Sequence, residues 1–498
     1  MTDTTAPTGA LPAEGLPAAR VLDEIRALRA ADRPTHGGRL FAYVYDPGVA
    51  GLDELAQAAY AECAHVNGLD PTAFPSLLAM ENALVGAAGR LLGGGPGSAA
   101  PDVVGSVTGG GTESLILAVK AARDARPELT EPRIVVPVSG HAAFAKAAHY
   151  LRVALDQVPV DPETLRPSAG AVAAAIRPET VLVACSAPSY AHGVVDPVAE
   201  IAAVAAAAGV RCHVDACFGG WALPWLRRLG APVPPFDFTV DGVTSISVDL
   251  HKYAYAPKGV SVLLHRDAAL RAPQYFGYAD WPGYTMVNPV IASTRSGGPI
   301  AGAYATLRHL GEDGYLRLAA ATREAVAGLA DAVRHTDGLR LMTEPESTVV
   351  CLTGDGDPTL DLFVLVDELA ARGWHTQPQL SYAGLPASVH LTVTAAVAPR
   401  VAEFGPDLAD AVAAARAAGP VRLPDELLAL ARTLTPAALT PELVAGLAAG
   451  LGLAGGDPAA GPVPGRMAVV NTLLDAAPVA LRERLLVEFV GLLQRPAW

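Results

Sequence analysis

The stretch TSISVDLHKYAYAPKG, residues 244–259, joins a β-branched apolar run to two lysines, Lys252 and Lys258. The chain holds only four lysines among its 36 basic residues, so arginine supplies almost every positive charge. Arginine stays protonated and forms no imine, whereas lysine can lose its proton and form one when its pKa is lowered. Lys252 is therefore a candidate for covalent chemistry, against the alternative that it is an ordinary solvated lysine.

This run is one of several short apolar runs that alternate with helical patterns between residues 101 and 270. Such alternation predicts parallel βαβ units with helices on both faces of a sheet. The runs are Ile134–Val138, Val181–Ala184, Val210–Val214, Ser245–Val248 and Val260–Leu264. We therefore expect an α/β fold with a mostly parallel central sheet, followed by a smaller α+β unit.

Helices are predicted before this region, at residues 52–64 and 76–92, where apolar residues recur every three or four positions. The segment Tyr275–Ile300 is rich in Gly, Pro and aromatic residues and predicts a loop. A long helix is expected from about Ala301 to beyond Gly314, with a break. Three further strands are predicted at Thr348–Leu352, Phe363–Val366 and Val389–Val393.

The last segment, Leu423–Trp498, is mostly helical in pattern and includes a Gly/Pro-rich linker at Gly455–Gly465. These patterns predict four parts of the chain. They are a flexible tail at 1–19, a helical segment at 20–95, a large domain at 96–335, and a small C-terminal α+β domain at 336–498.

Composition excludes several classes of protein. The formal net charge of −14 argues against a nucleic-acid partner, because phosphate backbones are bound by clustered Lys and Arg. The sequence contains no run of 18 consecutive apolar residues, so it predicts no membrane span. The N-terminus lacks the basic and apolar regions of a signal peptide. Five cysteines without framework spacing indicate reduced thiols and a cytoplasmic location.

A glycine run, Gly109-Gly110-Gly111-Thr112-Glu113-Ser114, precedes an apolar helical pattern. Glycines let the backbone approach an anion, and the helix N-terminus then offers free N–H groups. Gly110, Gly111 and Thr112 are thus candidates for holding a phosphate, although a capped glycine turn explains the same letters.

Two other strand ends carry candidate groups. Asp215 ends an apolar run, where a carboxylate could hold a protonated ring nitrogen, and His141 could lie flat on an aromatic ring. Ordinary turn and structural roles are the alternatives. A metal site from Cys212, His213, Asp215 and Cys217 is disfavoured, because their spacing matches no known zinc pattern.

Together, the lysine, the carboxylate, the histidine and the phosphate cradle fit pyridoxal 5'-phosphate. The lysine forms a Schiff base, the carboxylate keeps the pyridine nitrogen protonated, and the glycine loop holds the phosphate. Parallel strands bring their carboxyl ends to one edge of a sheet, so the four groups are expected to meet there.

These motifs resemble the fold-type I, group II pyridoxal phosphate decarboxylase superfamily, with its aspartate aminotransferase-like fold. Within it, the chain is most similar to the sphingosine-1-phosphate lyase family. The resemblance runs from about Gly38 to the C-terminus and rests on residues 67–75, 108–114, 139–146, 192–197, 213–220 and 242–259.

The resemblance implies roles on the cofactor side of the site. Lys252 would be the Schiff-base lysine, His251 a phosphate contact, Asp215 the partner of the pyridine nitrogen and His141 the stacking ring. Tyr190 would transfer a proton. The remaining implied phosphate contacts are Gly111 and Thr112, with Gly297 or Gly298 from a partner subunit, because family members work as homodimers with shared sites.

The substrate side matches the lyase family only in part. Lys258 resembles the second lysine that reaches the substrate phosphate, while Tyr45 and Thr294 stand where the family has a tyrosine and a serine. The family's Asn-x-Leu-His-Pro motif has Asp70 in place of histidine. A carboxylate facing a phosphate is repulsive, so Asp70 could instead pair with an amine or with Lys258.

The expected function is a pyridoxal phosphate-dependent carbon–carbon lyase. It would cleave a 2-amino-3-hydroxy substrate, phosphorylated or otherwise anionic, to an aldehyde and an amine. The alternatives are an amino-acid decarboxylase, which Asp70 makes more credible, and a catalytically silent binding homologue, which the intact cofactor residues disfavour. Partners are then a small-molecule amine or amino acid and a second copy of the chain, with no metal.

Overall fold

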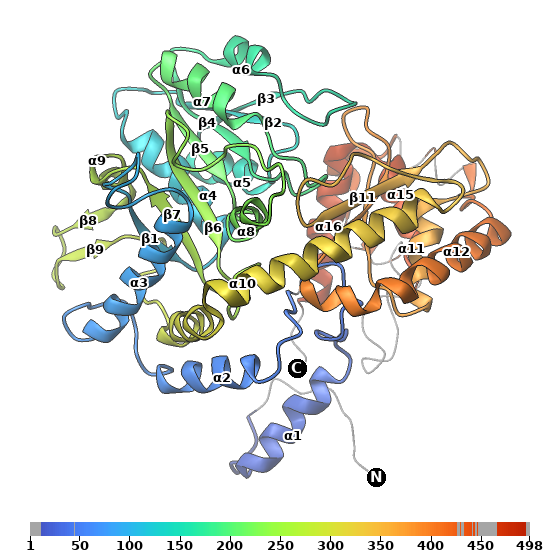
Figure 1. Ribbon diagram of the computed structural model, residues 1–498, viewed down its shortest axis with the longest axis horizontal. Coiled ribbons are helices and arrows are strands. Elements are labelled where there is room, and N and C mark those ends of the chain that lie inside the picture. Colours follow the sequence, from blue (N-terminus) through green and yellow to red (C-terminus); the bar gives the residue numbers. More distant parts are fainter. Residues whose placement is uncertain are drawn as a thin grey trace.

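The computed structural model describes residues 11–43, 45–425 and 466–494, together with 429, 433–440, 442, 443 and 446. Two sheets organise these residues, a larger one near the middle of the chain and a smaller one beyond it. The long helix α10 (Gly297–Arg334) runs from beside the larger sheet to the smaller one, as Figure 1 shows.

The larger sheet has seven strands in the order β1-β7-β6-β5-β4-β2-β3. Its strands are β1 (Val104–Thr108), β2 (Arg133–Pro137), β3 (Ala154–Val158), β4 (Thr180–Ser186), β5 (Arg211–Asp215), β6 (Val243–Asp249) and β7 (Ser261–His265). Only β7 runs antiparallel to its neighbours, β1 and β6, while the other pairs are parallel. The predicted mostly parallel α/β sheet is therefore confirmed.

Alternation along the strands explains why helices cover both faces of this sheet. On β4, Leu182 and Ala184 join the apolar cluster under α4 and α5, whereas Val183 and Cys185 join the cluster under α7 and α8. The helices are α4 (Gly111–Asp124), α5 (Ala143–Leu151), α6 (Ala169–Ala175), α7 (Val198–Ala207), α8 (Leu223–Arg228) and α9 (Ala268–Arg271). Burial on both faces leaves the strand ends as the place for polar chemistry.

The N-terminal helices are α1 (Ala18–Arg29), α2 (Leu52–Glu62) and α3 (Pro75–Leu91). Helices α2 and α3 pack against α10, and α3 also contacts β1. Helix α1 buries none of its residues and projects from the bottom of the molecule in Figure 1.

The smaller sheet is antiparallel, in the order β10-β11-β13-β12. Its strands are β10 (Leu339–Leu341), β11 (Val349–Gly354), β12 (Gln377–Gln379) and β13 (Ser388–Thr392), with α11 (Leu362–Ala371), α12 (Val401–Ala418), α15 (Ala468–Ala476) and α16 (Val479–Leu493) around it. Phe41, Trp374 and Phe404 form an aromatic centre of its core, with ring centroids 5.1–5.7 Å apart. The predicted α+β character of this part is present.

One predicted strand is wrong, because Phe363–Val366 lies in helix α11. The side chain of Asp361 accepts hydrogen bonds from the backbone N–H groups of Phe363 and Val364, which caps the helix. Phe363–Val366 are all buried, and α11 packs against α12 and α15, so the helix is apolar on several sides. A short continuous apolar run does not distinguish a buried helix from a strand.

The predicted loop at Tyr275–Ile300 also needs correction. It contains a hairpin of β8 (Phe276–Tyr278) and β9 (Met286–Asn288), and helix α10 begins at Gly297 rather than near Ala301. The expected break in that helix lies at Gly311, whose φ of 58° and ψ of −178° interrupt the helical backbone.

The linker predicted at Gly455–Gly465 and residues 1–10 of the predicted tail lie outside the described residues, and the four-part division of the chain stays a prediction. None of the helices in the described ranges combines the length and hydropathy needed to cross a bilayer.

Candidate active site

A cavity of about 650 Å³ lies where the large sheet's strands end. The segments that follow β1, β2, β4, β5 and β6 all contribute to it, as expected for parallel strands that point to one edge. Its lining includes Gly109–Glu113, His141, Tyr190, Asp215, Cys217, Phe218, Asp249, His251, Lys252 and Ile291. The structure therefore brings the predicted Gly110, Gly111, Thr112, His141, Tyr190, Asp215, His251 and Lys252 together.

The amino group of Lys252 forms a buried ion pair with Asp249. The distance from Lys252 Nζ to Asp249 Oδ2 is 3.0 Å, and the Asp249 side chain is only 2% exposed. Ser261 Oγ donates a hydrogen bond of 2.5 Å to the other carboxylate oxygen. Burial alone would lower the pKa of Lys252, but the attraction of Asp249, together with Tyr45, Cys217 and Asp215, outweighs burial and raises that pKa. Asp249 thus holds the lysine as an ammonium group.

Gly111 opens helix α4 beside this pair. A Cβ atom at Gly111 would lie 2.8 Å from both carboxylate oxygens of Asp249 and from Cys217 Sγ, so a side chain does not fit there. No side chain caps the helix at Gly110, and the first N–H groups of a helix have no partner within it. Glu113 instead accepts from the N–H groups of Gly109 and Ile291. The cradle offers backbone donors to an anion.

Asp215 lies at the end of β5 and faces the same cavity. Its Oδ1 accepts a hydrogen bond of 3.0 Å from the Cys217 N–H and a longer one of 3.5 Å from Ser247 Oγ. These contacts hold the carboxylate at the strand end. The other carboxylate oxygen takes no hydrogen bond from the described residues and is able to accept one from a ligand.

Tyr190 and His141 stand next to each other at the cavity, with their rings edge to face and their centroids 6.3 Å apart. His141 Nδ1 accepts a hydrogen bond from the Ala143 N–H. Burial raises the pKa of Tyr190, so its phenol carries its proton near neutral pH. Tyr190 can therefore serve as a proton donor.

His251 lies between the two lysines: it precedes Lys252 in the chain, and its carbonyl group contacts Lys258. Its Nδ1 lies 2.9 Å from the Val260 carbonyl, which can only accept, so Nδ1 carries the hydrogen and Nε2 is free of it. Lys258 Nζ donates to the His251 carbonyl at 3.1 Å and to the Tyr43 carbonyl at 3.0 Å. It also lies 4.7 Å from the centre of the Tyr45 ring.

Six predicted residues lie outside the cavity lining in this chain: Lys258 and Tyr45, described above, and Asp70, Thr294, Gly297 and Gly298. Asp70 is exposed and accepts hydrogen bonds from Thr72 and Ala73, which lowers the pKa of its carboxyl group. Thr294 is exposed in the loop before α10, and an Asn67–Ser296 bridge joins that loop to the Asp70 segment. Gly297 and Gly298 are buried against Val66 and Tyr60, respectively. The roles of these six residues stay predictions.

The alternative metal cluster is not assembled. The ring nitrogens of His213 lie 2.8 Å from Ser245 Oγ and 3.2 Å from Ser247 Oγ, and burial lowers the pKa of this histidine to about 3. Within the described ranges, no group of three His, Cys, Asp or Glu side chains is close enough to hold a metal ion.

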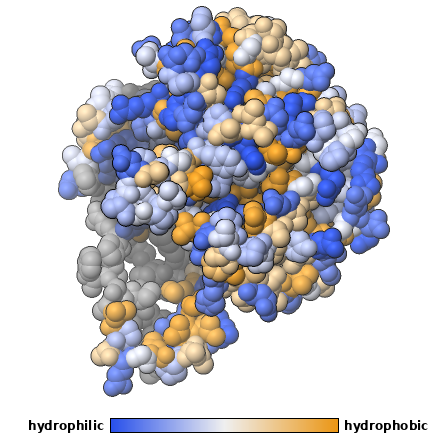
Figure 2. Space-filling model, turned by 90° about the vertical axis from the view of Figure 1, so that its left-hand side faces the viewer, coloured by the Kyte–Doolittle hydropathy of each residue, from blue (hydrophilic) through white to orange (hydrophobic). Residues whose placement is uncertain are grey.

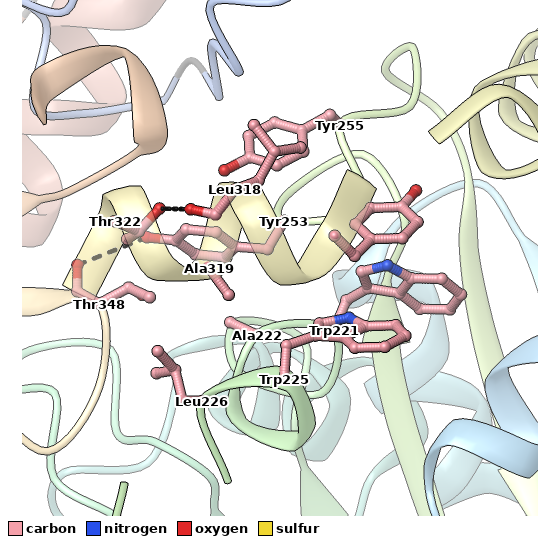
Figure 3. A pocket seen from close by; sticks show the side chains of 11 residues that line it. Trp221, Ala222, Trp225, Leu226, Tyr253, Tyr255, Leu318, Ala319, Thr322 and Thr348 are labelled. Atoms are coloured by element: carbon pink, nitrogen blue, oxygen red, sulfur yellow. Dashed lines mark hydrogen bonds between the residues drawn. The ribbon is translucent and has the colours of Figure 1, made fainter. Parts of the chain in front are cut away.

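Buried aromatic residues anchor the loop that follows Lys252. Tyr253 donates to the Val393 carbonyl at 2.9 Å, and Tyr315 on α10 donates to the Ala254 carbonyl at 2.9 Å. Figure 3 shows Tyr253 pointing along α10 toward Thr348, with Trp221 and Trp225 below it around a water-sized cavity of about 10 Å³. This packing fixes the backbone that follows Lys252 and so the position of that lysine.

Sequence reasoning missed two kinds of residue at this site. Asp249 was visible three positions before Lys252, but nothing in the letters showed which strand neighbour it would face. Phe218, Gln377 and His390 surround Lys252 or Tyr190, and they come from separate parts of the chain. Only the fold brings Gln377 and His390 to the cavity edge.

The family described as "Pyridoxal-dependent decarboxylase conserved domain" matches residues 35–353. The chain belongs to this family of pyridoxal phosphate-dependent enzymes. A second family, described as "Pyridoxal-dependent enzyme, C-terminal putative HTH domain", matches residues 424–492.

Among individual relatives, the chain is 37% identical to sphingosine-1-phosphate lyase of Arabidopsis thaliana over 420 residues, or 83% of this chain and 75% of the lyase. The Dictyostelium discoideum enzyme of the same name is 36% identical over 81% of this chain and 74% of its own length. These matches place the chain on the sphingosine-1-phosphate lyase branch of the family, so the predicted resemblance is confirmed.

Solved structures agree. The sphingosine-1-phosphate lyase of Burkholderia pseudomallei superposes with a TM-score of 0.76 and 35% identity, covering 83% of this chain and 95% of that one. Glutamate decarboxylase of Lactobacillus brevis has a TM-score of 0.73 at 21% identity over 84% of this chain and 97% of its own, which shows the shared fold.

The residues present fit pyridoxal phosphate. A side-chain-free cradle at Gly111, a carboxylate oxygen of Asp215 that is open to the cavity and the amino group of Lys252 all face one cavity. They would hold the phosphate, the ring nitrogen and the aldehyde carbon, respectively.

Proposed function

We propose that this chain is a carbon–carbon lyase that cleaves a phosphorylated 2-amino-3-hydroxy substrate by a retro-aldol reaction to an aldehyde and an amine. The observation that carries the proposal is the pair of lysines at one end of β6. Lys252 lines the cavity beside Asp249. Lys258 lies outside the lining, over the Tyr45 ring, and donates to the carbonyl of His251, the residue before Lys252. One lysine serves the cofactor, and the second can meet an anionic group on the substrate.

Bound pyridoxal phosphate supplies an electron sink for the pair of electrons released when the substrate bond breaks. The chain's own residues would orient the cofactor and supply a proton to the reacting group. Asp215 would keep a proton on the ring nitrogen, and His141 would cover the ring. Tyr190 Oη would hold and deliver a proton at the reacting group, because it remains a phenol near neutral pH.

Product analysis tests the reaction. With a long-chain base phosphate, we expect a long-chain aldehyde and phosphoethanolamine in equal amounts. Carbon dioxide released from a panel of amino acids, with no aldehyde from the base phosphate, would instead show a decarboxylase. If protein that carries the cofactor forms neither product, the result supports a catalytically silent homologue.

Lys258 makes the binding of an anionic substrate depend on pH. Partial burial and the nearby charge of Lys252 together lower the pKa of Lys258 to about 8. Since the ammonium form is lost above that pH, we expect KM for the phosphorylated substrate to rise roughly tenfold as one charge-assisted hydrogen bond is lost. Steady-state kinetics across this pH range measure the effect.

The Lys258→Arg variant is the matched control, because arginine remains protonated throughout this range. It is expected to keep KM low at the alkaline end. A KM that stays constant with pH in the unmodified protein would remove Lys258 from the substrate-phosphate site.

We infer that the protein is a homodimer in the cytoplasm. Exposed apolar side chains on α1 and on the β8–β9 hairpin support a covered surface. They are Val21, Leu22, Ile25, Leu28, Phe276, Tyr278, Trp281, Tyr284 and Val287. Figure 2 shows apolar atoms gathered at the lower end of the molecule, where α1 lies. A monomer in sedimentation velocity would contradict the dimer, while the five free cysteines support a reducing compartment.

A further inference from the structure

The phenol of Tyr190 is held by the small sheet. Tyr190 Oη donates a hydrogen bond of 2.6 Å to Gln377 Oε1, and Gln377 lies on β12, the edge strand of that sheet. On its other side, the Tyr190 ring stacks on His390 of β13, with centroids 4.6 Å apart and planes 23° from parallel. A candidate proton donor of the large domain is thus oriented by two side chains from outside it.

The loop that carries Tyr190 is tied to the same sheet at further points. Gln379 Nε2 donates to the Ala191 carbonyl at 2.9 Å, and Ser347 Oγ donates to the Gly193 carbonyl at 2.8 Å. These two bonds hold only the backbone of the loop. Gln377 is the side chain that meets the hydroxyl group itself.

We propose that Gln377 is a positioning residue for Tyr190. It fixes the orientation of the phenol beside the cavity and hydrogen-bonds to the phenol oxygen in both of its protonation states. The proposal rests on the role of Tyr190 in proton transfer given above. Both Gln377 and His390 lie beyond residues 35–353, the part of the chain that matches the decarboxylase family.

An amide can serve both states because it carries an acceptor and a donor at one end. Oε1 accepts from the phenol while Tyr190 holds its proton. Gln377 Nε2 makes no hydrogen bond to the described residues, so the amide is free to turn over and donate to the oxygen after the proton leaves. A hydrogen bond to a charged oxygen is stronger than one to a neutral oxygen. Gln377 thus offsets part of the cost of burying a phenolate, and it lowers the pKa of Tyr190 against the larger effect of burial.

The test compares three variants of the full-length protein with its cofactor bound. Gln377→Met keeps the length of the side chain and removes its hydrogen bonds. Gln377→Glu keeps an acceptor but removes the donor and adds a negative charge. Gln379→Met is the matched control, because it removes a bond to the backbone of the same loop and leaves the phenol contact in place.

Two readouts are needed. The first is kcat and KM as a function of pH. The second is the titration of Tyr190 itself, followed by ¹³Cζ-tyrosine NMR, in which Tyr190→Phe identifies its signal among the 13 tyrosines. The NMR titration does not depend on the reaction, so it separates the Gln377 contact from the proposed function. If Tyr190→Phe retains full activity, the proton-transfer role fails while the titration still tests the contact.

We expect Gln377→Met to lower kcat about tenfold or more with little change in KM, on the scale of general acid–base catalysis. The midpoint of the Tyr190 titration should move to higher pH, and further still in Gln377→Glu, because a carboxylate opposes the phenolate. Gln379→Met should leave that midpoint in place. A Gln377→Met protein with unchanged kcat and unchanged Tyr190 titration overturns the proposal, as does an equal shift in Gln379→Met.

Discussion

The Lys252→Ala protein should lose catalysis together with the visible absorption that we expect from a cofactor linked to Lys252. Lys252 is the one lysine in the cavity lining of the described chain, and an alanine there cannot form the covalent link. We expect kcat to fall on the order of 10⁴-fold or more, the scale seen when a covalent nucleophile is removed. Absorption spectroscopy of the purified protein and single-turnover kinetics measure the two effects.

Lys146→Ala is the control for this experiment. Lys146 is also one of the four lysines, but it is exposed on α5, with its Nζ 5.4 Å from the centre of the Tyr150 ring. Its removal should leave both the spectrum and kcat unchanged. Visible absorption that persists in Lys252→Ala would show that another amine forms the link.

Asp249→Asn should destabilise the cofactor-free protein at neutral pH by about 3–5 kcal/mol, the cost of leaving a buried ion without its partner. The reason is the 3.0 Å contact with Lys252, in which the carboxylate is almost fully buried. Urea unfolding followed by circular dichroism gives the free energy of unfolding. An Asp249→Asn protein as stable as the unmodified one would show that the ion pair contributes nothing to the fold.

The double variant Asp249→Asn/Lys252→Met is the control, because it removes both charges and leaves an apolar side chain of similar length. It should recover most of the lost stability, since a buried ion pair is often no more stabilising than well-packed neutral residues. A double variant as unstable as the single one would point to lost packing or the lost Ser261 hydrogen bond instead.

The same pair has a signature in pH. Burial raises the pKa of Asp249, but Lys252 and His251 outweigh burial and lower it overall. The stabilisation from the carboxylate is therefore present above its unfolded pKa and is lost as the pH falls through its lower folded value. Folding raises the pKa of Lys252. The stabilisation from its ammonium group is therefore complete below the pKa of an unfolded lysine and is lost as the pH rises through the folded pKa. The difference in the free energy of unfolding between Asp249→Asn and the unmodified protein should therefore become smaller at acid pH.

Much of the cofactor side could be predicted because each residue follows its own strand. Gly111, His141, Asp215 and Lys252 come directly after apolar runs, and parallel strands bring such positions to one edge. A local pattern and one topological rule were enough. The substrate side had no such rule, and Asp70 and Thr294 were placed by resemblance alone.

The errors arose where local letters supported two structures. Phe363–Val366 has the composition of a strand, yet the Asp361 cap and burial against α12 and α15 make it helical. The hairpin β8–β9 lies in a segment whose glycines, prolines and aromatics predicted a loop. In the helix, tertiary packing overrode a weak local preference. The hairpin is held by the pairing of its own two strands, and β8 is exposed along its length.

By itself, the sequence determined the parallel sheet, the glycine turn before α4 and the lysine that follows β6, because periodicity and strand ends are local properties of the chain. Only the tertiary structure decided that Asp249 faces the Lys252 amine and that Gln377 holds the phenol of Tyr190 across 187 positions. The physical reason is that a hydrogen bond or an ion pair depends on distances of about 3 Å. Separation along the sequence does not specify such contacts, whereas the packing of the two sheets around α10 does.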